Sequence, residues 1–91
     1  MTEEQIRKEI GLRLKISRLQ LEISQVEMAN EIGIIQVQLS LIEKGKYKVS
    51  ALILHRLAEK YSINPNYLLG FDTEPKISGN IIKMPSIKKV T

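Results

Sequence analysis

Helix-start signals recur along the first 65 residues, and they constrain the fold of this chain more than any other feature. A Ser, Thr or Asn side chain before a helix accepts a hydrogen bond from a backbone N–H of the first turn, and a Glu or Gln three residues later can bond back. Signals of this kind are Thr2-Glu3-Glu4-Gln5, Ser24-Gln25-Val26-Glu27, Ser50 and Asn64-Pro65. Glycines typical of helix ends follow at Gly33, Gly45 and Gly70. The sequence therefore predicts a succession of short helices.

The first two helices are predicted from the spacing of their apolar residues. A helix that begins at Thr2 runs to about residue 21 and tolerates Gly11 at a cost of about 1 kcal/mol. Its apolar positions are Ile6, Ile10, Leu14, Leu19 and Leu21. A second helix of about two turns begins at Ser24 and stops at Gly33.

The pattern after Gly33 is ambiguous, because apolar residues partly alternate as in a strand and also satisfy helical spacing. We predict a helix over residues 35–44, since no second strand is available to pair with this segment and Lys44-Gly45 forms a basic last turn with a glycine cap. A fourth helix follows Ser50 through Tyr61, and a fifth runs from Pro65 to Gly70.

Length and composition limit what else the chain contains. Ninety-one residues allow one core, which we place in a domain over residues 1–71, with an appendage over residues 72–91. Prolines and a glycine interrupt the apolar residues of that appendage, which predicts an irregular or strand-like C-terminal arm and a candidate oligomerisation segment. The chain has no run of 18 apolar residues and no signal-like start, so we expect a cytoplasmic protein without a membrane partner.

The sequence gives little support for a catalytic site or a metal site. His55 is the only histidine, lies in an apolar stretch where a structural role is expected, and has no recognisable nucleophile beside it in the sequence. The absence of cysteine excludes disulfides, thiolate zinc sites and cysteine nucleophiles. We therefore predict that the protein is not an enzyme and has no metal site or cofactor.

The distribution of charge is more informative than the net charge of +4. Lys44, Lys46 and Lys48 lie within five positions that contain no acidic residue, and Tyr47 lies between them. This cluster directly follows the helix predicted over residues 35–44. Its spacing is suited to contacts with phosphate, and a solvated charged loop is the alternative.

Two short helices joined through Gly33, the second followed by Glu43-Lys44-Gly45, have the spacing of a helix-turn-helix. From Ile10 to Leu69, about two thirds of the chain, the sequence resembles the helix-turn-helix domains of phage repressor and Cro-like regulators. The residues that carry the resemblance are Ile10-Gly11, Arg13, Arg18, Ser24-Gln25, Ala29, Gly33, Ser40, Ile42-Glu43, Gly45 and Ala58. The resemblance implies an all-α, five-helix, lambda-repressor-like bundle.

In proteins similar to this one, the third helix reads DNA. The matching base-contacting positions are Gln36, Val37, Gln38 and Leu41. The Gln36 amide can pair with the edge of adenine, while Val37 or Leu41 can meet a thymine methyl group, which predicts a half-site that contains A and T. The alternative for Gln36 and Gln38 is that both are only solvated helix residues.

The resemblance also implies residues that orient the domain on DNA. Phosphate contacts are expected from Gln25, Ile35, Ser40, Lys44, Lys46 and Lys48. Gln25 stands at a helix start, where free backbone N–H groups attract anions. Arg18 and Glu43 match positions that pair in similar repressors, and we assign this ion pair a structural role first.

Two departures from the pattern complicate the interpretation. Ile35 occupies a position usually held by Ser or Thr, so the recognition helix loses a cap worth about 1 kcal/mol, and Glu22 replaces the usual turn glycine. With Val37 and Leu41, Ile35 makes the predicted DNA-facing surface unusually apolar. An apolar strip on a short helix can equally dock a protein.

We interpret the sequence as a sequence-specific double-stranded DNA-binding transcriptional regulator, with repression as its expected role. One short recognition helix reads few base pairs, so we expect a homodimer. The alternative is a protein-interaction module, such as an antitoxin or a regulator that sequesters a partner protein through its tail.

Overall fold

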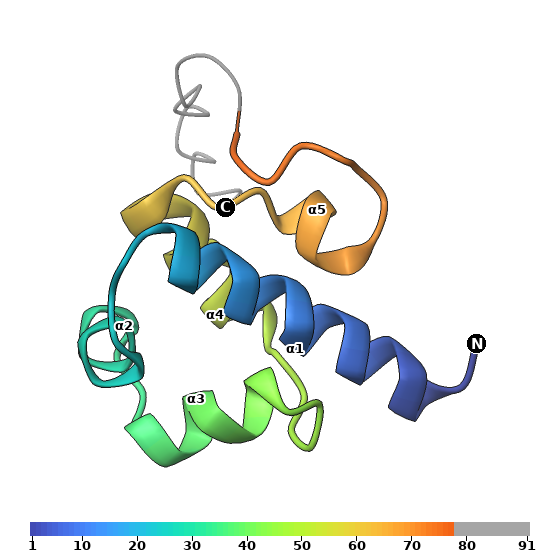
Figure 1. Cartoon of the computed structure of the whole chain (residues 1–91), viewed down its shortest axis with the longest axis horizontal. Coiled ribbons are helices and arrows are strands. Elements are labelled where there is room, and N and C mark those ends of the chain that lie inside the picture. The colour runs from blue at the N-terminus through green and yellow to red at the C-terminus, as the bar shows by residue number, and fades with distance from the viewer. Residues whose placement is uncertain (78–91) are drawn as a thin grey trace, which may run out of the picture.

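The structure is a computed structural model that describes residues 1–77, and these residues form five helices. The elements in chain order, labelled in Figure 1, are α1 (Glu3–Gln20), α2 (Gln25–Ile32), α3 (Gln36–Glu43), α4 (Ala51–Tyr61) and α5 (Pro65–Leu69). The prediction of an all-α, five-helix fold is confirmed. In the described part of the chain, no helix is long and apolar enough to cross a membrane.

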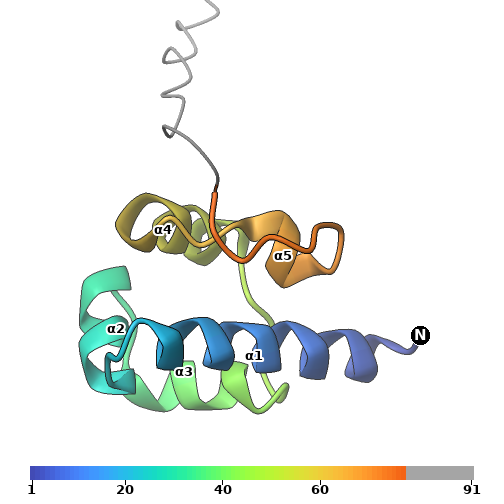
Figure 2. The ribbon, with the colours of Figure 1, turned by 45° about the horizontal axis from the view of Figure 1, so that its top comes forward.

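The longest helix, α1, lies between the other elements. It contacts α3 on one side and α5 on the other, while α2 contacts both α3 and α4. Figure 2 shows α3 on one side of α1, with α4 and α5 on the opposite side. The surface of α3 that points away from α1 is therefore separated from α4 and α5 by the body of the domain.

One apolar core joins the helices and contains residues from every one of them. Its members are Leu14, Met28, Ala29, Ile32, Leu39, Ile42, Ile53, Leu57, Ile63 and Leu68. Tyr61 and Tyr67 pack against this cluster and are partly buried. Since α2 and α3 each contribute buried residues from short helices, packing and not local propensity holds them in place.

The apolar pattern of α1 misassigns two core positions. Ile10 and Leu14 are buried as predicted, but Ile6 and Leu19 are exposed. Ile6 lies in the first turns of α1, which extend beyond the other helices towards the N-terminus in Figure 2. The core-facing side near the other end instead carries Ser17 and Arg18. Apolar residues occur on both faces of α1, so periodicity alone does not identify the buried one.

The caps follow the predicted signals with one exception. Thr2 and Gln5 form a complete capping box, whereas at Ser24 only the serine hydroxyl bonds, accepting from the Glu27 backbone N–H at 3.0 Å. Ile35 precedes α3 without a side-chain cap, as its apolar side chain predicts. The helix predicted over residues 35–44 is present with Ile35 and Lys44 as its capping residues.

Two residues give the turns of the helix-turn-helix their shape. Gly33 ends α2 in the left-handed conformation with φ of +74°, where a side chain would be strained. Glu22, which stands in place of the usual turn glycine, adopts a φ of +59° before α2. A non-glycine residue therefore bears the left-handed backbone of this turn.

Gly11 lets α1 approach the end of α3 very closely. A Cβ atom at this position would lie 2.2 Å from the Ile42 carbonyl oxygen and 2.7 Å from that of Glu43. No rotamer change relieves such a clash, because both atoms belong to the backbone. Gly11 is thus required by packing, whereas its sequence context predicted only a tolerated helix residue.

The beginning of the C-terminal arm lies against the connection between α4 and α5. The Asn64 N–H donates to the Pro75 carbonyl and the Ile77 N–H donates to the Ser62 carbonyl, each at 2.9 Å. A single antiparallel bridge joins Ile63 and Lys76. Residues 72–77 are thus irregular with one strand-like contact, and the rest of the predicted arm, residues 78–91, lies outside the described residues.

Candidate nucleic-acid interface

The predicted base-contacting residues lie outside the buried face of α3, which is formed by Leu39, Ile42 and Glu43. Gln36 and Val37 are exposed, and Gln38 and Leu41 are partly buried. The side chain of Ile35 just before the helix is exposed as well, while Ser40 is partly buried. All six residues lie on α3 or at its first cap, so the structure brings these predicted contact residues close together.

The Arg18–Glu43 ion pair joins α1 to the last turn of α3. The Arg18 Nε atom donates to Glu43 Oε2 at 2.7 Å, and a second guanidinium nitrogen donates to Oε1 at 3.1 Å. Both residues are buried, with exposed fractions of 8% and 6%. The hydrogen bond to Glu43 raises the pKa of Arg18 above its ordinary value. A third bond, from Arg18 to the Ile23 carbonyl at 2.9 Å, extends the contact to the turn before α2.

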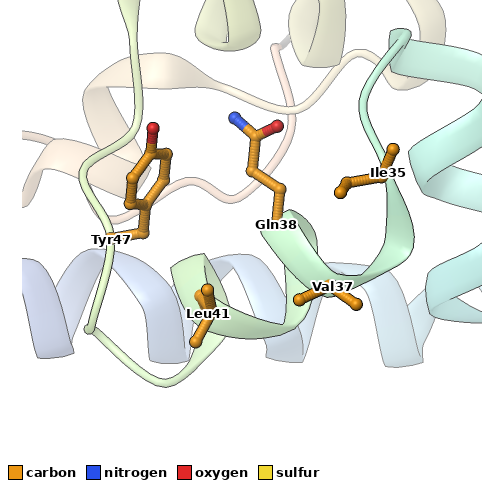
Figure 3. A pocket seen from close by; sticks show the side chains of 5 residues that line it. All are labelled: Ile35, Val37, Gln38, Leu41 and Tyr47. Atoms are coloured by element: carbon orange, nitrogen blue, oxygen red, sulfur yellow. The ribbon is translucent and has the colours of Figure 1, made fainter.

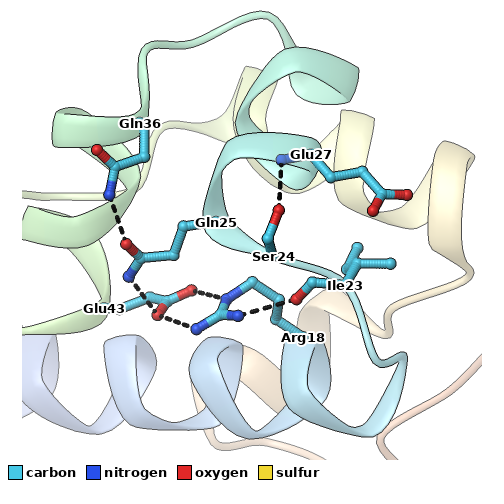
Figure 4. A network of polar contacts seen from close by, with 7 residues as sticks. All are labelled: Arg18, Ile23, Ser24, Gln25, Glu27, Gln36 and Glu43. Atoms are coloured by element: carbon cyan, nitrogen blue, oxygen red, sulfur yellow. Dashed lines mark hydrogen bonds and ion pairs between the residues drawn. The ribbon is translucent and has the colours of Figure 1, made fainter.

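Two glutamines extend this ion pair to the surface, as Figure 4 shows. Gln25 Nε2, from the first residue of α2, donates to Glu43 Oε1 at 3.0 Å. Gln36 Nε2, from the first residue of α3, donates to Gln25 Oε1 at 2.7 Å. The chain of contacts therefore runs from a buried guanidinium to an exposed amide.

The orientation of both amides follows from the carboxylate. An ionised carboxylate only accepts hydrogen bonds, so Gln25 must turn its Nε2 group towards Glu43. The Oε1 atom of Gln25 then faces Gln36, which must present its own Nε2 group in return. Reversing either amide would bring two acceptors or two donors together.

Gln36 is thereby left with one free amide hydrogen and with Oε1 as an acceptor. Adenine presents one acceptor, N7, and one donor, the N6 amino group, in the major groove, whereas guanine presents two acceptors there. A Gln36 amide held in this way is complementary to adenine. It has no second free hydrogen for the second acceptor of guanine.

Beside this polar site, α3 carries a surface depression of about 220 Å³. Its lining residues are Ile35, Val37, Gln38, Leu41 and Tyr47. Figure 3 shows Gln38 pointing between Ile35 and Tyr47, with Val37 and Leu41 along the helix. Gln38 makes no hydrogen bond to any residue within 1–77, so its amide can rotate, in contrast to that of Gln36.

Unpaired positive charge is concentrated next to α3. Several basic side chains of α1 and α4 lie within 4.0 Å of a carboxylate: Arg7, Lys8, Arg13 and Lys60. Lys44, Lys46 and Lys48 are exposed, and none of them has such a carboxylate among the described residues. Positive charge therefore remains available for an anion at the end of α3.

The fold and this surface define a helix-turn-helix protein. The family profile described as a helix-turn-helix domain matches residues 11–70. The chain belongs to this family, which confirms the resemblance seen in the sequence. It is thus a DNA-binding domain of the helix-turn-helix class, and this class supports a role in the regulation of transcription.

A solved structure gives a more particular likeness. The crystal structure of the restriction-modification controller protein C.AhdI from Aeromonas hydrophila matches this chain with a TM-score of 0.68 and 25% sequence identity. The match covers 75% of this chain and 99% of the controller protein. No curated protein sequence matches the chain.

Three features of the surface were not predicted. Tyr47 lines the depression on α3, although its position between lysines indicated only a charged loop. Gln25, expected to contact phosphate, is bonded to Glu43 and Gln36, and no local pattern indicates contacts across 18 and 11 residues. His55, which lies in an apolar stretch of the sequence, is exposed on α4. Separately, residues 1–77 contain no group of His, Cys, Asp or Glu side chains that could hold a metal ion.

Proposed function

We propose that the protein is a sequence-specific double-stranded DNA-binding regulator of transcription, acting as a repressor, and that α3 enters the major groove. The observation that carries this proposal is the Gln36 amide, which is exposed yet oriented by hydrogen bonds that begin at the buried Arg18–Glu43 pair. A solvated surface glutamine needs no such anchor. Val37, Gln38 and Leu41 complete the base-contacting set.

Phosphate contacts are proposed on both sides of the groove. Lys44, Lys46 and Lys48 carry unpaired charge beside the end of α3, and Gln25 stands at the first turn of α2, where backbone N–H groups attract anions. Ile35 and Ser40 flank the base-contacting positions and would lie near the backbone of the duplex. In this proposal the protein acts by binding alone, without catalysis, metal or cofactor.

A homodimer is part of the proposal, because one helix of eight residues reads too few base pairs to select an operator. Large apolar side chains are exposed on the other side of the domain from α3. They include Leu52 on α4, Leu69 on α5 and Phe71, whose exposed fraction is 85%. A second copy that covered these residues would leave both α3 helices free.

A protein-interaction module remains a second candidate, and one observation favours it. Ile35 and Val37 have exposed fractions of 69% and 59%, which are high for apolar residues on a short helix. An antitoxin or a partner-sequestering regulator would use this surface, or the arm, to bind protein. In that case the α3 surface would show no preference among duplex sequences.

The test is a titration of the full chain against A/T-containing and random duplexes at two salt concentrations. Specific binding appears as a ratio of affinities between sequences above a strongly salt-dependent background. We expect a clear ratio for a selected sequence, and a ratio near one at both salt concentrations would refute sequence-specific recognition.

Two variants separate the assigned roles. Gln36→Ala should lose about 1 to 3 kcal/mol of discrimination at one base pair, because it removes the oriented amide. Lys46→Ala should weaken binding to every sequence alike and lower the salt dependence. Identical behaviour of the two variants would show that the roles are wrongly assigned.

A further inference from the structure

The depression on α3 differs from the rest of the proposed DNA-facing surface because its walls are apolar. Ile35, Val37 and Leu41 line it from α3 and its first cap, and the Tyr47 ring closes it from the following loop (Figure 3). Gln38 is the only side chain with an amide in this lining. A site of this kind offers contact area to an apolar group and little selection by hydrogen bonds.

The charge around the depression indicates what occupies it. Lys44, Lys46 and Lys48 lie in the segment that joins α3 to Tyr47 and beyond, and no acidic residue interrupts them. Such surroundings are complementary to a polyanion, whereas an apolar protein segment would gain nothing from three exposed lysines. In the major groove of DNA, the apolar group on a base edge is the C5-methyl group of a pyrimidine.

We propose that the depression formed by Ile35, Val37, Leu41 and Tyr47 binds a pyrimidine C5-methyl group, so that 5-methylcytosine can replace thymine at one position of the bound site. The inference rests on the proposed function, because it requires α3 in the major groove. It adds that the methylation state of cytosine in the DNA changes the affinity of the protein.

The contrast between the two glutamines explains why the methyl group and not the base is recognised. Thymine carries an acceptor, O4, beside its methyl group, while 5-methylcytosine carries a donor, the N4 amino group. The Gln38 amide has no hydrogen bond to the described residues and can turn either its nitrogen or its oxygen to the base. Gln36, whose orientation is fixed by Gln25, has no such freedom.

The experiment starts from a duplex obtained by binding-site selection from a random pool. Each thymine is replaced in turn by uracil, which removes only the methyl group. At the position that faces the depression, cytosine and 5-methylcytosine are then compared as well. We expect thymine to bind about fourfold more tightly than uracil, and 5-methylcytosine about fourfold more tightly than cytosine, because each pair differs only by one buried methyl group.

A matched pair of valine variants connects the effect to the depression. Val37→Thr replaces one wall methyl group by a hydroxyl group and should lower the thymine-to-uracil ratio. Val26→Thr is the control, because Val26 is a similarly exposed valine, 56% against 59%, on α2 outside the lining. Thermal unfolding of both variants verifies that neither substitution unfolds the domain.

The outcomes separate this inference from the function on which it rests. Failure to select any duplex would overturn both. Specific binding with equal affinity for thymine and uracil at every position would overturn only the methyl-binding site, as would an unchanged ratio in Val37→Thr. A preference for thymine over 5-methylcytosine as strong as that over cytosine would show that the base, and not its methyl group, is read.

Discussion

The two parts of the α3 surface differ in how they are connected to the rest of the domain. Gln36 is linked by hydrogen bonds through Gln25 to a buried ion pair, so its amide has one orientation. The depression beside it consists of side chains that make no polar contact with residues 1–77. The hydrogen-bond network fixes the positions of the donor and the acceptor of Gln36, whereas the depression fixes only the shape of the surface.

Stability and specificity are therefore coupled at one side of α3 and separate at the other. A change in the polar network disturbs buried charge, whereas a change in Val37 alters a residue that is mostly solvated. Variants of the polar network should therefore lower stability and specificity together, whereas variants of the depression should weaken recognition without lowering stability.

Arg18→Ala should destabilise the domain by about 3–5 kcal/mol, because Glu43 would remain buried without its partner. Urea denaturation followed by circular dichroism measures the change. The double variant Arg18→Met/Glu43→Leu should recover much of the lost stability, since it removes both charges at once. A single variant as stable as the natural chain would show that the pair is not desolvated in solution.

Gln25→Leu should relax the choice between adenine and guanine at the base pair that Gln36 contacts, by up to about tenfold. Without Gln25 Oε1, the Gln36 amide can rotate and offer both of its hydrogens. Binding to duplexes that differ only at this base pair measures the ratio. Gln38→Leu serves as the comparison and should leave that ratio unchanged, since Gln38 has no part in the network.

Ile35→Thr should raise stability by about 1 kcal/mol, because a threonine hydroxyl can supply the cap that α3 lacks. The same substitution removes part of the apolar wall, so the preference for a methylated pyrimidine should decrease. Thermal unfolding and the thymine-to-uracil ratio report the two effects. Loss of stability together with lost recognition would contradict the separation of the two sides.

At low pH we expect a local structural change at the beginning of the C-terminal arm. Hydrogen bonds from the Glu74 N–H and the Asn64 amide hold the pKa of Asp72 below its ordinary value. The contribution of these hydrogen bonds to stability is therefore complete above the ordinary aspartate pKa of about 3.9. It is lost as the pH falls through the lower pKa of Asp72 in the folded protein. The NMR shift of the Ile77 amide should show this step, and Asp72→Asn should abolish it.

Much of the fold could be predicted because its signals are local. Thr2, Ser50 and Asn64 each start a helix with the expected side-chain bond, and Gly33 and Gly70 end one. Even the ambiguous segment after Gly33 is correctly predicted as a helix, because no partner strand is available for it. Such predictions need only a few neighbouring residues, and the structure agrees with them.

The predictions that failed depend on contacts between distant residues. Leu19 fits the apolar spacing of α1, but which face is buried depends on where α3 and α5 lie. The role of Gly11 appears only when the carbonyl groups of Ile42 and Glu43 are placed against it. Likewise, Tyr47 joins the depression because the loop after α3 folds back, and no spacing in the sequence encodes that return.

The contact at Gly11 has a consequence for how such a domain changes its target. Because α1 meets the carbonyl groups at the end of α3 with no side chain between them, the seating of α3 does not depend on its outward residues. Positions 37, 38 and 41, which lie outside the Gln25–Gln36 network, can therefore be exchanged as a set while the helix keeps its place. Transplanting them onto a related scaffold together with the pair Gln25 and Gln36 should move the target preference with them.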